Sequence, residues 1–314
     1  MFIRALATAA ISLICLAPPS WADTVYGVKS QSPGGTLLSQ APAVLFSFSD
    51  NGGPAFASIG AIGLNGGGID VDGLALSRNH GLLGFELSGT DPNRSSRLIS
   101  IDTATAAATA IGGVMTGREM RGAMFDRQDR LWAVDSAHGE LLRIDPTNGA
   151  VISATTIATN GLARDISPGT DLAQTMDGTV ILSIYRFEQP DAAAPSLFTL
   201  DLDTAIATLA AVDPLPDPLF ANIPIYIGGL AAGGPDNPGA LFAIDADGQE
   251  DIFRYDSPGY TRTLLIQNII PSFNAGGSDL ASFAPLPVPE PASHALLTLG
   301  LAGLFAARRR LKAR

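Results

Sequence analysis

A short apolar segment that ends in aspartate recurs five times along the chain, and this repeat limits the fold more than any other feature. The five segments are Leu45–Asp50, Leu98–Asp102, Leu141–Asp145, Leu197–Asp201 and Ile252–Asp256. Successive aspartates are 52, 43, 56 and 55 residues apart. A period of roughly 40 to 50 residues is typical of propeller blades rather than of helical repeats. The sequence therefore predicts similar β-units in series.

Each unit contains three more strand-like segments. The preceding partner strands are Val25–Val28, Leu82–Leu87, Leu131–Asp135, Val180–Tyr185 and Leu241–Asp245. The following segments have the β-branched content of outer strands, as in Thr105–Ile111, Ala150–Ile157 and Thr204–Val212. Each unit opens with a strand of small residues: Gly73–Leu76, Gly122–Phe125, Asp171–Gln174, Gly229–Ala232 or Asp279–Ser282. Small side chains suit innermost strands, because these strands crowd around a common axis.

The two ends of the chain complement each other. The opening strand at Asp279 has no partners after it, and the first unit, from Val25, has no opening strand. We therefore predict an all-β, five-bladed β-propeller of four strands per blade within residues 23–284, closed by pairing of the N- and C-terminal strands. A β-sandwich is the alternative architecture. Strand-like alternation, with 34 Gly and 22 Pro, excludes a helical bundle.

The segment Leu131–Gly149 resembles the strand–turn–strand unit of NHL and lactonase-type propellers. It has Asp-Ser-Ala-His-Gly between two strands and Asp-Pro-Thr-Asn-Gly after them. The resemblance covers one or two blades. The second run also has the composition of an ordinary turn, with Pro at the second position and Gly where φ is positive. The Gly-His and Trp-Asp spacing of WD40 repeats does not occur.

The C-terminal tail has three parts in a fixed order. Val288–Ser293 is a Pro-rich element at the end of a linker over 285–293, Ala295–Ala307 is an apolar run within a helix predicted over 294–307, and Arg308–Arg314 is a basic stop. Thirteen apolar residues are fewer than the roughly 18 to 20 of an ordinary membrane-spanning helix. The basic end favours the cytoplasmic side of a membrane.

This tail resembles the PEP-CTERM domain, by which Gram-negative bacteria direct exported proteins to an exosortase in the inner membrane. The resemblance implies transient anchoring in that membrane, followed by processing and release to the cell surface or the medium. The sorting and processing residues that it implies in the tail are Pro289, Glu290, Pro291, Arg308, Arg309 and Arg310.

The N-terminus predicts a signal peptide over residues 1–22. Arg4 supplies a positive charge, Ala5–Pro18 is apolar, and the small residues at 20 and 22 predict cleavage by signal peptidase between Ala22 and Asp23. The one cysteine, Cys15, lies in this leader and follows Ile14, which disfavours a lipoprotein site. The mature chain therefore contains no disulfide.

The charge of the body restricts its partners. The chain has 19 basic and 30 acidic residues; one basic residue belongs to the leader and five to the basic stop, which leaves residues 23–307 with 13 basic and 30 acidic residues, a net charge of −17. Such a surface repels nucleic acid and anionic lipid. It suits a soluble exported protein and is compatible with binding of cations or neutral glycans.

Residues that could carry chemistry are few. His80 and His138 fall in turns between strands and His294 in the tail, so a zinc site is disfavoured. No Gly-x-Ser-x-Gly elbow occurs, and Gly66–Gly68 is interpreted as a flexible connection. Asp245–Asp251 alternates acids as a calcium loop does, but a hairpin turn with solvated acids explains the same residues.

Charged residues gather in the loops that lead into the innermost strands. The candidate axial ligand-binding residues are Asp72, Glu119, Arg121, Arg164, Asp165 and Asp279, with Asp70 and Arg118 beside them. Around an axial funnel they could hold Ca²⁺, the one cofactor considered, or polarise a lactone or ester as in lactonase-type propellers. They could equally form ion pairs around a closed channel, and their varied composition argues against a symmetrical cage.

Three classes of function follow from these features. The first is a non-catalytic exported propeller of the cell envelope or extracellular matrix that binds polysaccharide or protein. The second is a calcium-dependent lactonase-like or lyase-like enzyme. The third is a purely structural matrix component. No catalytic residue is assigned, and signal peptidase and exosortase are the expected processing partners.

Overall fold

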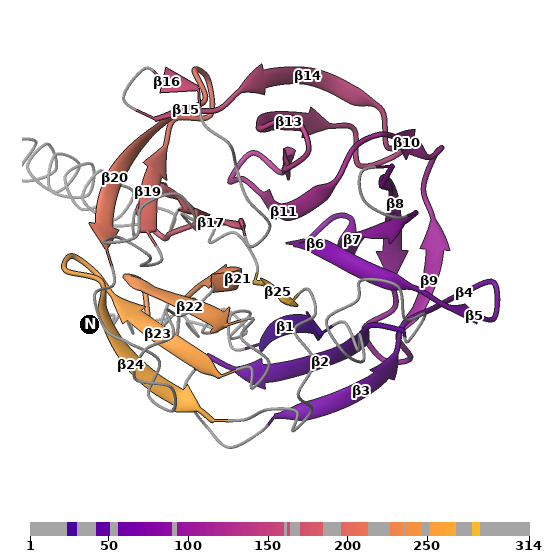
Figure 1. Cartoon of the computed structure of the whole chain (residues 1–314). Helices are drawn as coiled ribbons and strands as arrows, with labels where there is room; N and C mark the ends of the chain where they lie inside the picture. Colours follow the sequence, from indigo (N-terminus) through magenta and orange to yellow (C-terminus); the bar gives the residue numbers. More distant parts are fainter. Residues whose placement is uncertain are drawn as a thin grey trace, which may run out of the picture.

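The structure, a computed structural model, describes residues 24–29, 42–50, 56–89, 93–159, 162–163, 170–184, 196–212, 227–234, 237–245, 251–267 and 278–282. All regular elements in these ranges are β-strands, from β1 to β25. They form separate sheets that surround a common axis (Figure 1). The predicted all-β propeller arrangement is confirmed, and the alternative of a β-sandwich is wrong.

Three of the five sheets formed by the described residues have the predicted four strands. The first has the order β25 (Ser278–Ala281), β1 (Thr24–Lys29), β2 (Val44–Ser49) and β3 (Ala57–Ala61). The third has the order β11 (Met120–Phe125), β12 (Leu131–Asp135), β13 (Glu140–Ile144) and β14 (Val151–Thr156). The fifth has the order β21 (Ile227–Ala232), β22 (Ala240–Asp245), β23 (Ile252–Asp256) and β24 (Thr261–Ile266).

The other two sheets are larger, so the prediction of four strands in every blade is wrong. The second contains β6 (Asp70–Ser77), β7 (Gly81–Ser88), β8 (Ser95–Ile101) and β9 (Ala107–Ala110), with the additional short strands β4 (Gly63–Leu64), β5 (Gly67–Gly68) and β10 (Met115–Thr116). The fourth contains β17 (Leu172–Gln174), β18 (Val180–Ile184), β19 (Ser196–Leu200) and β20 (Ile206–Val212), with the additional strands β15 (Ala158–Thr159) and β16 (Leu162–Ala163).

The extra strands come from the connections between neighbouring sheets. β4 pairs in parallel with β9, and β15 pairs in parallel with β20, so each connection covers the outer edge of the sheet that it enters. The interpretation of Gly66–Gly68 as a flexible connection is also wrong. β4 and β5 pair as a small hairpin, and Gly66 takes the positive φ of 81° that its turn requires.

The first and last described strands pair with each other, as predicted. β1 and β25 are antiparallel, with Gly27 opposite Leu280 and Val28 opposite Asp279. In Figure 1, β25, β6, β11, β17 and β21 are the innermost strands of their sheets, and β3, β9, β14, β20 and β24 lie outside. Apolar side chains of adjacent sheets pack together between them, as where Trp132 of β12 meets the cluster around Leu182 of β18.

Two of the repeated aspartates, Asp102 and Asp201, cap the turn that follows them. Asp102 accepts hydrogen bonds of 2.9 Å from the backbone N–H groups of Ala104 and Thr105. Asp201 does the same for residues 203 and 204. Such side-chain caps fix the turn after the third strand of a sheet. Each cap is followed by a residue of positive φ, namely 59° at Ala106 and 54° at Ala205, from which the outer strand starts.

Several predicted segments lie outside the described residues. These are the leader with its cleavage site at Ala22 and Asp23, and the tail with Pro289, Glu290, Pro291, Arg308, Arg309 and Arg310. Across the ranges that are described, no helix has the length and apolar character needed to cross a membrane. The signal peptide and the tail helix remain predictions.

Candidate functional site

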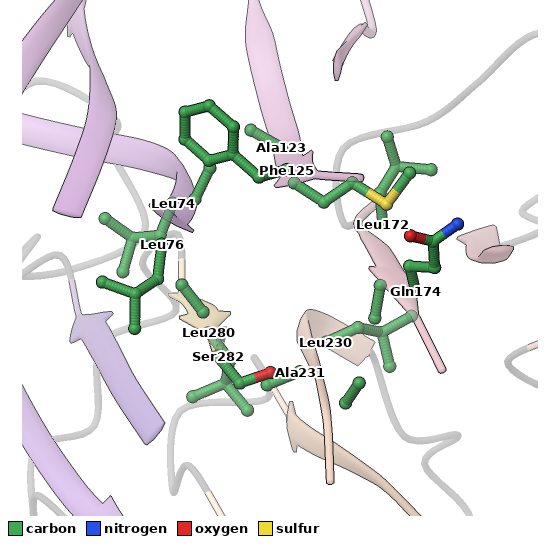
Figure 2. A pocket seen from close by; sticks show the side chains of 15 residues that line it. Leu74, Leu76, Ala123, Phe125, Leu172, Gln174, Leu230, Ala231, Leu280 and Ser282 are labelled. Atoms are coloured by element: carbon green, nitrogen blue, oxygen red, sulfur yellow. The ribbon is translucent and has the colours of Figure 1, made fainter. Parts of the chain in front are cut away.

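The axis of the molecule is a narrow apolar channel. Each of the five innermost strands contributes three consecutive residues to its wall, as Figure 2 shows for Leu74, Ala123, Leu172, Leu230 and Leu280. The cavity along it is about 20 Å³, which is room for one or two water molecules. The channel interior is therefore too small for a sugar ring or a lactone.

Three buried aspartates mark the end of the channel at which the innermost strands begin. Asp72, Asp171 and Asp279 are 3 %, 0 % and 0 % exposed. Each stands one or two residues before the first channel-lining residue of its strand. The strands end at the other mouth, where Gln174 and Ser282 supply polar side chains to the channel wall (Figure 2).

Two of these carboxyl groups bind backbone donors from all five innermost strands. Asp279 accepts hydrogen bonds from the N–H of Leu280 in its own strand, at 2.7 Å, and from that of Leu74 in β6. Asp171 accepts from its own Leu172 at 2.6 Å and from two other strands, through Ala123 of β11 at 3.2 Å and Leu230 of β21. One N–H from each sheet thus points to this pair.

Glycines make this convergence possible. A Cβ on Gly122 would lie 2.5 Å from the Cα of Asp171, and one on Gly229 would lie 2.5 Å from the Cα of Asp279. No side chain fits at these distances, so glycine is required where the innermost strands approach the aspartates.

Burial also changes the protonation of the three acids. It raises the pKa of Asp171 to about 8 and that of Asp72 to about 7. The pKa of Asp279 is raised well above its ordinary value by burial, by the charge of Asp171 and by a hydrogen bond between the two carboxyl groups. A hydrogen bond between two carboxyl groups requires that one of them carries a proton, so the raised pKa values belong to the pair.

A chain of ion pairs extends from Asp72 toward the surface. Arg121 Nη1 donates to Asp72 Oδ2 at 2.7 Å, and Arg121 Nη2 donates to Glu119 Oε1. Glu119 Oε1 also accepts from Arg94 Nη1 at 2.5 Å. Burial alone would lower the pKa of Arg121, but Asp72 and Glu119 raise it. Likewise, burial opposes ionisation of Glu119, but Arg121 and Arg94 lower its pKa overall.

A second cluster lies beside this chain, at the end of β12. Asp135 is fully buried, and its Oδ2 lies 2.8 Å from both Arg118 Nη1 and His138 Nδ1. Arg118 Nη1 also donates to Glu140 Oε2 at 2.9 Å. The backbone N–H of Glu119 donates to Asp135 Oδ1 at 3.0 Å and so joins the two clusters. Half of the His138 side chain is exposed, which makes it the most accessible titratable group here.

The sequence-predicted site residues are brought together only in part. Asp72, Glu119 and Arg121 form one ion-pair chain, and Asp279 lies close enough to Asp72 for the charge of Asp72 to act on it. Arg164 and Asp165 lie outside the described residues.

Sequence reasoning missed Asp171, Arg94, Asp135 and His138 as members of the site. For Asp171 a signal was available, because Asp-Leu-Ala begins the innermost strand both at residue 171 and at residue 279.

The surroundings of the axial carboxyl groups favour binding of protons over binding of a metal ion. Among the residues that the structure describes, no three His, Cys, Asp or Glu side chains are placed to hold a metal. The oxygens of Asp171 and Asp279 face backbone N–H groups, whose partial positive charge repels a cation. Binding of Ca²⁺ by the acids of this site therefore stays a hypothesis.

Comparison with known protein families accounts for the end of the chain. Residues 287–310 match the PEP-CTERM protein-sorting motif. The tail is a PEP-CTERM sorting motif. The match contains the Pro-Glu-Pro element, the apolar run and the first three basic residues of the stop. This PEP-CTERM tail marks the chain as an exported protein that passes through the membrane and is processed by an exosortase.

Comparison with solved structures finds chains of similar fold at low sequence identity. A GH43 glycoside hydrolase aligns with a TM-score of 0.50 at 13% identity, over 86% of this chain and 54% of its own. A gluconolactonase from Xanthomonas campestris aligns with a TM-score of 0.41 at 16% identity, over 62% of each chain.

A protein of unknown function from Bacteroides thetaiotaomicron gives a TM-score of 0.48 at 12% identity, over 82% of this chain and 71% of its own. The chain spans less than two thirds of the hydrolase and of the gluconolactonase. No curated protein matches the sequence. At such identities, the likeness concerns the fold alone.

Proposed function

We propose that this protein is an exported, exosortase-sorted propeller that acts in the cell envelope or extracellular matrix by binding or scaffolding rather than by catalysis. The PEP-CTERM tail at residues 287–310 carries the proposal. We further propose that the five sheets are the five blades of one closed ring. The pairing of β1 with β25 supports that count, because it completes the first sheet with a strand from each end of the chain.

The state of the axial charges supports a non-catalytic role. Asp72 and Glu119 are paired with Arg121, and Asp171 and Asp279 hold backbone donors and each other. A catalytic acid or base needs a position from which it can reach a substrate. The channel of about 20 Å³ provides no such position beside these side chains. Partner contacts would therefore use the outer surfaces of the ring.

Processing of the tail is the first test of this proposal. We expect protein recovered outside the cell to begin at Asp23 and to lack Arg308–Arg314, because signal peptidase and exosortase remove the two ends. Glu290→Ala should leave the protein in the inner-membrane fraction, whereas Ser293→Ala, in the same linker but outside Pro-Glu-Pro, should be released normally. Intact-mass measurement and membrane fractionation check both results. A complete C-terminus on released protein contradicts the proposal.

Calcium addition distinguishes the proposed role from the alternative of a calcium-dependent lactonase-like or lyase-like enzyme. We expect millimolar Ca²⁺ to change the melting temperature of the purified protein by less than about 1 °C, because the axial carboxyl groups face backbone donors. A ligand that binds only the folded state raises the melting temperature. An increase of several degrees with Ca²⁺, but not with Mg²⁺ at equal concentration, would favour the enzyme.

A further inference from the structure

The carboxyl pair Asp171–Asp279 joins all five sheets at one point of the axis. Its two side chains come from the fourth and first sheets, and they accept N–H groups from every innermost strand. Two fully buried carboxylates in contact repel each other strongly, so the contact requires a proton between them.

We propose that Asp171 and Asp279 form a proton-dependent lock, in which one shared proton allows the two carboxyl groups to hold the five innermost strands together. The lock goes beyond the sorting and binding roles above, since it concerns the stability of the body itself. Loss of the proton leaves two carboxylates in one buried space and loosens the ring at its axis.

The charged residues around the Asp171–Asp279 pair do not take over the role of the shared proton. β6 presents Asp70 and Asp72 to this end of the axis, and the negative charge of Asp72 acts on both members of the pair. β11 presents Arg121, but Asp72 and Glu119 pair with it. In β1, the fully buried Lys29 lies opposite Ser278, one residue from Asp279. Apart from the pair itself, β17, β21 and β25 carry no ionisable side chain.

The direction of the pH effect follows from the raised pKa values. An aspartate in the unfolded chain releases its proton near pH 4, whereas burial raises the pKa of Asp72 to about 7 and also raises the pKa values of both members of the Asp171–Asp279 pair. The folded state therefore binds more protons than the unfolded state above about pH 4, and its stability falls as pH rises until the pair has lost its shared proton. The pKa values of Asp102 and Glu119 are lowered. These two groups therefore lose their contributions to folding stability only at acidic pH, where the shared proton is still bound.

Thermal melts of the mature protein from pH 5.5 to 8.5 test the lock. We expect the melting temperature of the wild type to fall by roughly 5–10 °C over this range. Asp279→Asn keeps a donor toward Asp171 but cannot release a proton, and its amide nitrogen cannot accept a backbone N–H. The variant should therefore melt lower at pH 5.5, and the gap to the wild type should close as pH rises.

Two controls assign the effect to the pair. Asp102→Asn changes an exposed turn carboxylate of lowered pKa, and its melting temperature should fall with pH as steeply as that of the wild type (the wild-type slope). Asp72→Asn removes the third buried acid and should keep most of the slope. The proposal is overturned if the wild-type melting temperature does not fall with pH, or if Asp72→Asn removes the slope and Asp279→Asn does not.

A second measurement covers the case in which Asp279→Asn does not fold. The infrared spectrum of the wild type at pH 6.5 should contain the carbonyl band of a protonated, buried carboxylic acid, and this band should weaken as pH rises together with the fall in melting temperature. Absence of the band at pH 6.5 would show that the pair holds no proton and would also overturn the proposal. Neither result depends on tail processing, so failure of the lock is distinguishable from failure of the proposed function.

Discussion

A chain that ends after Gly277 is expected to be unfolded or aggregated, whereas a chain that ends after Pro285 is expected to fold. Only the longer chain contains β25. This strand pairs with β1 over four residues, from Ser278 opposite Lys29 to Ala281 opposite Tyr26. Without β25, the first sheet loses its innermost strand. The shorter chain also loses Asp279 and with it the bond to Leu74 of β6.

The expected loss of stability is comparable with that of a whole domain, about 5–15 kcal/mol. Leu280 is fully buried against Phe46 and Phe242 in one apolar cluster, and its removal opens that cluster to water. The edge of β1 would also be exposed, which promotes aggregation. Circular dichroism melts and light scattering of both truncations measure the effect. Equal melting temperatures would mean that pairing of the chain ends contributes nothing to stability.

Adding one methyl group at Gly229 is expected to destabilise the body by more than about 3 kcal/mol. The Cβ of Gly229→Ala would lie 2.5 Å from both the Cα of Asp279 and the backbone nitrogen of Leu280. These are backbone atoms of a strand that is paired with β1, so they cannot move away without breaking the sheet. Overpacking of this kind costs roughly 1–3 kcal/mol where side chains can adjust, and here no side chain is available to do so.

Gly113→Ala is the matched control. A Cβ at Gly113 meets no atom within 4 Å, and we expect a change in stability of less than about 0.5 kcal/mol. Urea unfolding of the two variants gives the comparison directly, and Gly122→Ala, whose Cβ would lie 2.5 Å from the Cα of Asp171, should behave like Gly229→Ala. If Gly229→Ala unfolds at the same urea concentration as Gly113→Ala, the close approach of β21 to β25 is wrong.

The fold was predictable because its signal is local and repeated. Apolar strands that end in aspartate, such as Leu98–Asp102, reflect a turn cap that recurs at Asp145 and Asp201. The added strands were not predictable, because β4, β5, β10, β15 and β16 have two residues each. Two residues are too few for an alternating pattern, and their pairing depends on neighbouring sheets.

The candidate site was predictable in position but not in its pairing. The loops before the innermost strands indicated Asp72, Arg121 and Asp279 as neighbours of the axis. Which charges meet depends on contacts between distant segments, such as that of Arg121 with Asp72, 49 residues earlier. The site was interpreted as a ligand funnel because the sequence does not show that the innermost side chains fill the channel to about 20 Å³.

The direction of β25 has a consequence for the protein before it is released. β25 ends at Ala281, at the channel mouth of Ser282, and the sorting motif begins at residue 287. The apolar run that is predicted to enter the membrane begins at Ala295, and the twelve residues between Ser282 and Ala295 span at most roughly 43 Å. Until the predicted processing removes the tail, this linker would therefore tether the ring to the inner membrane from the mouth at Ser282. Exosortase cleavage would then release that mouth from the tether.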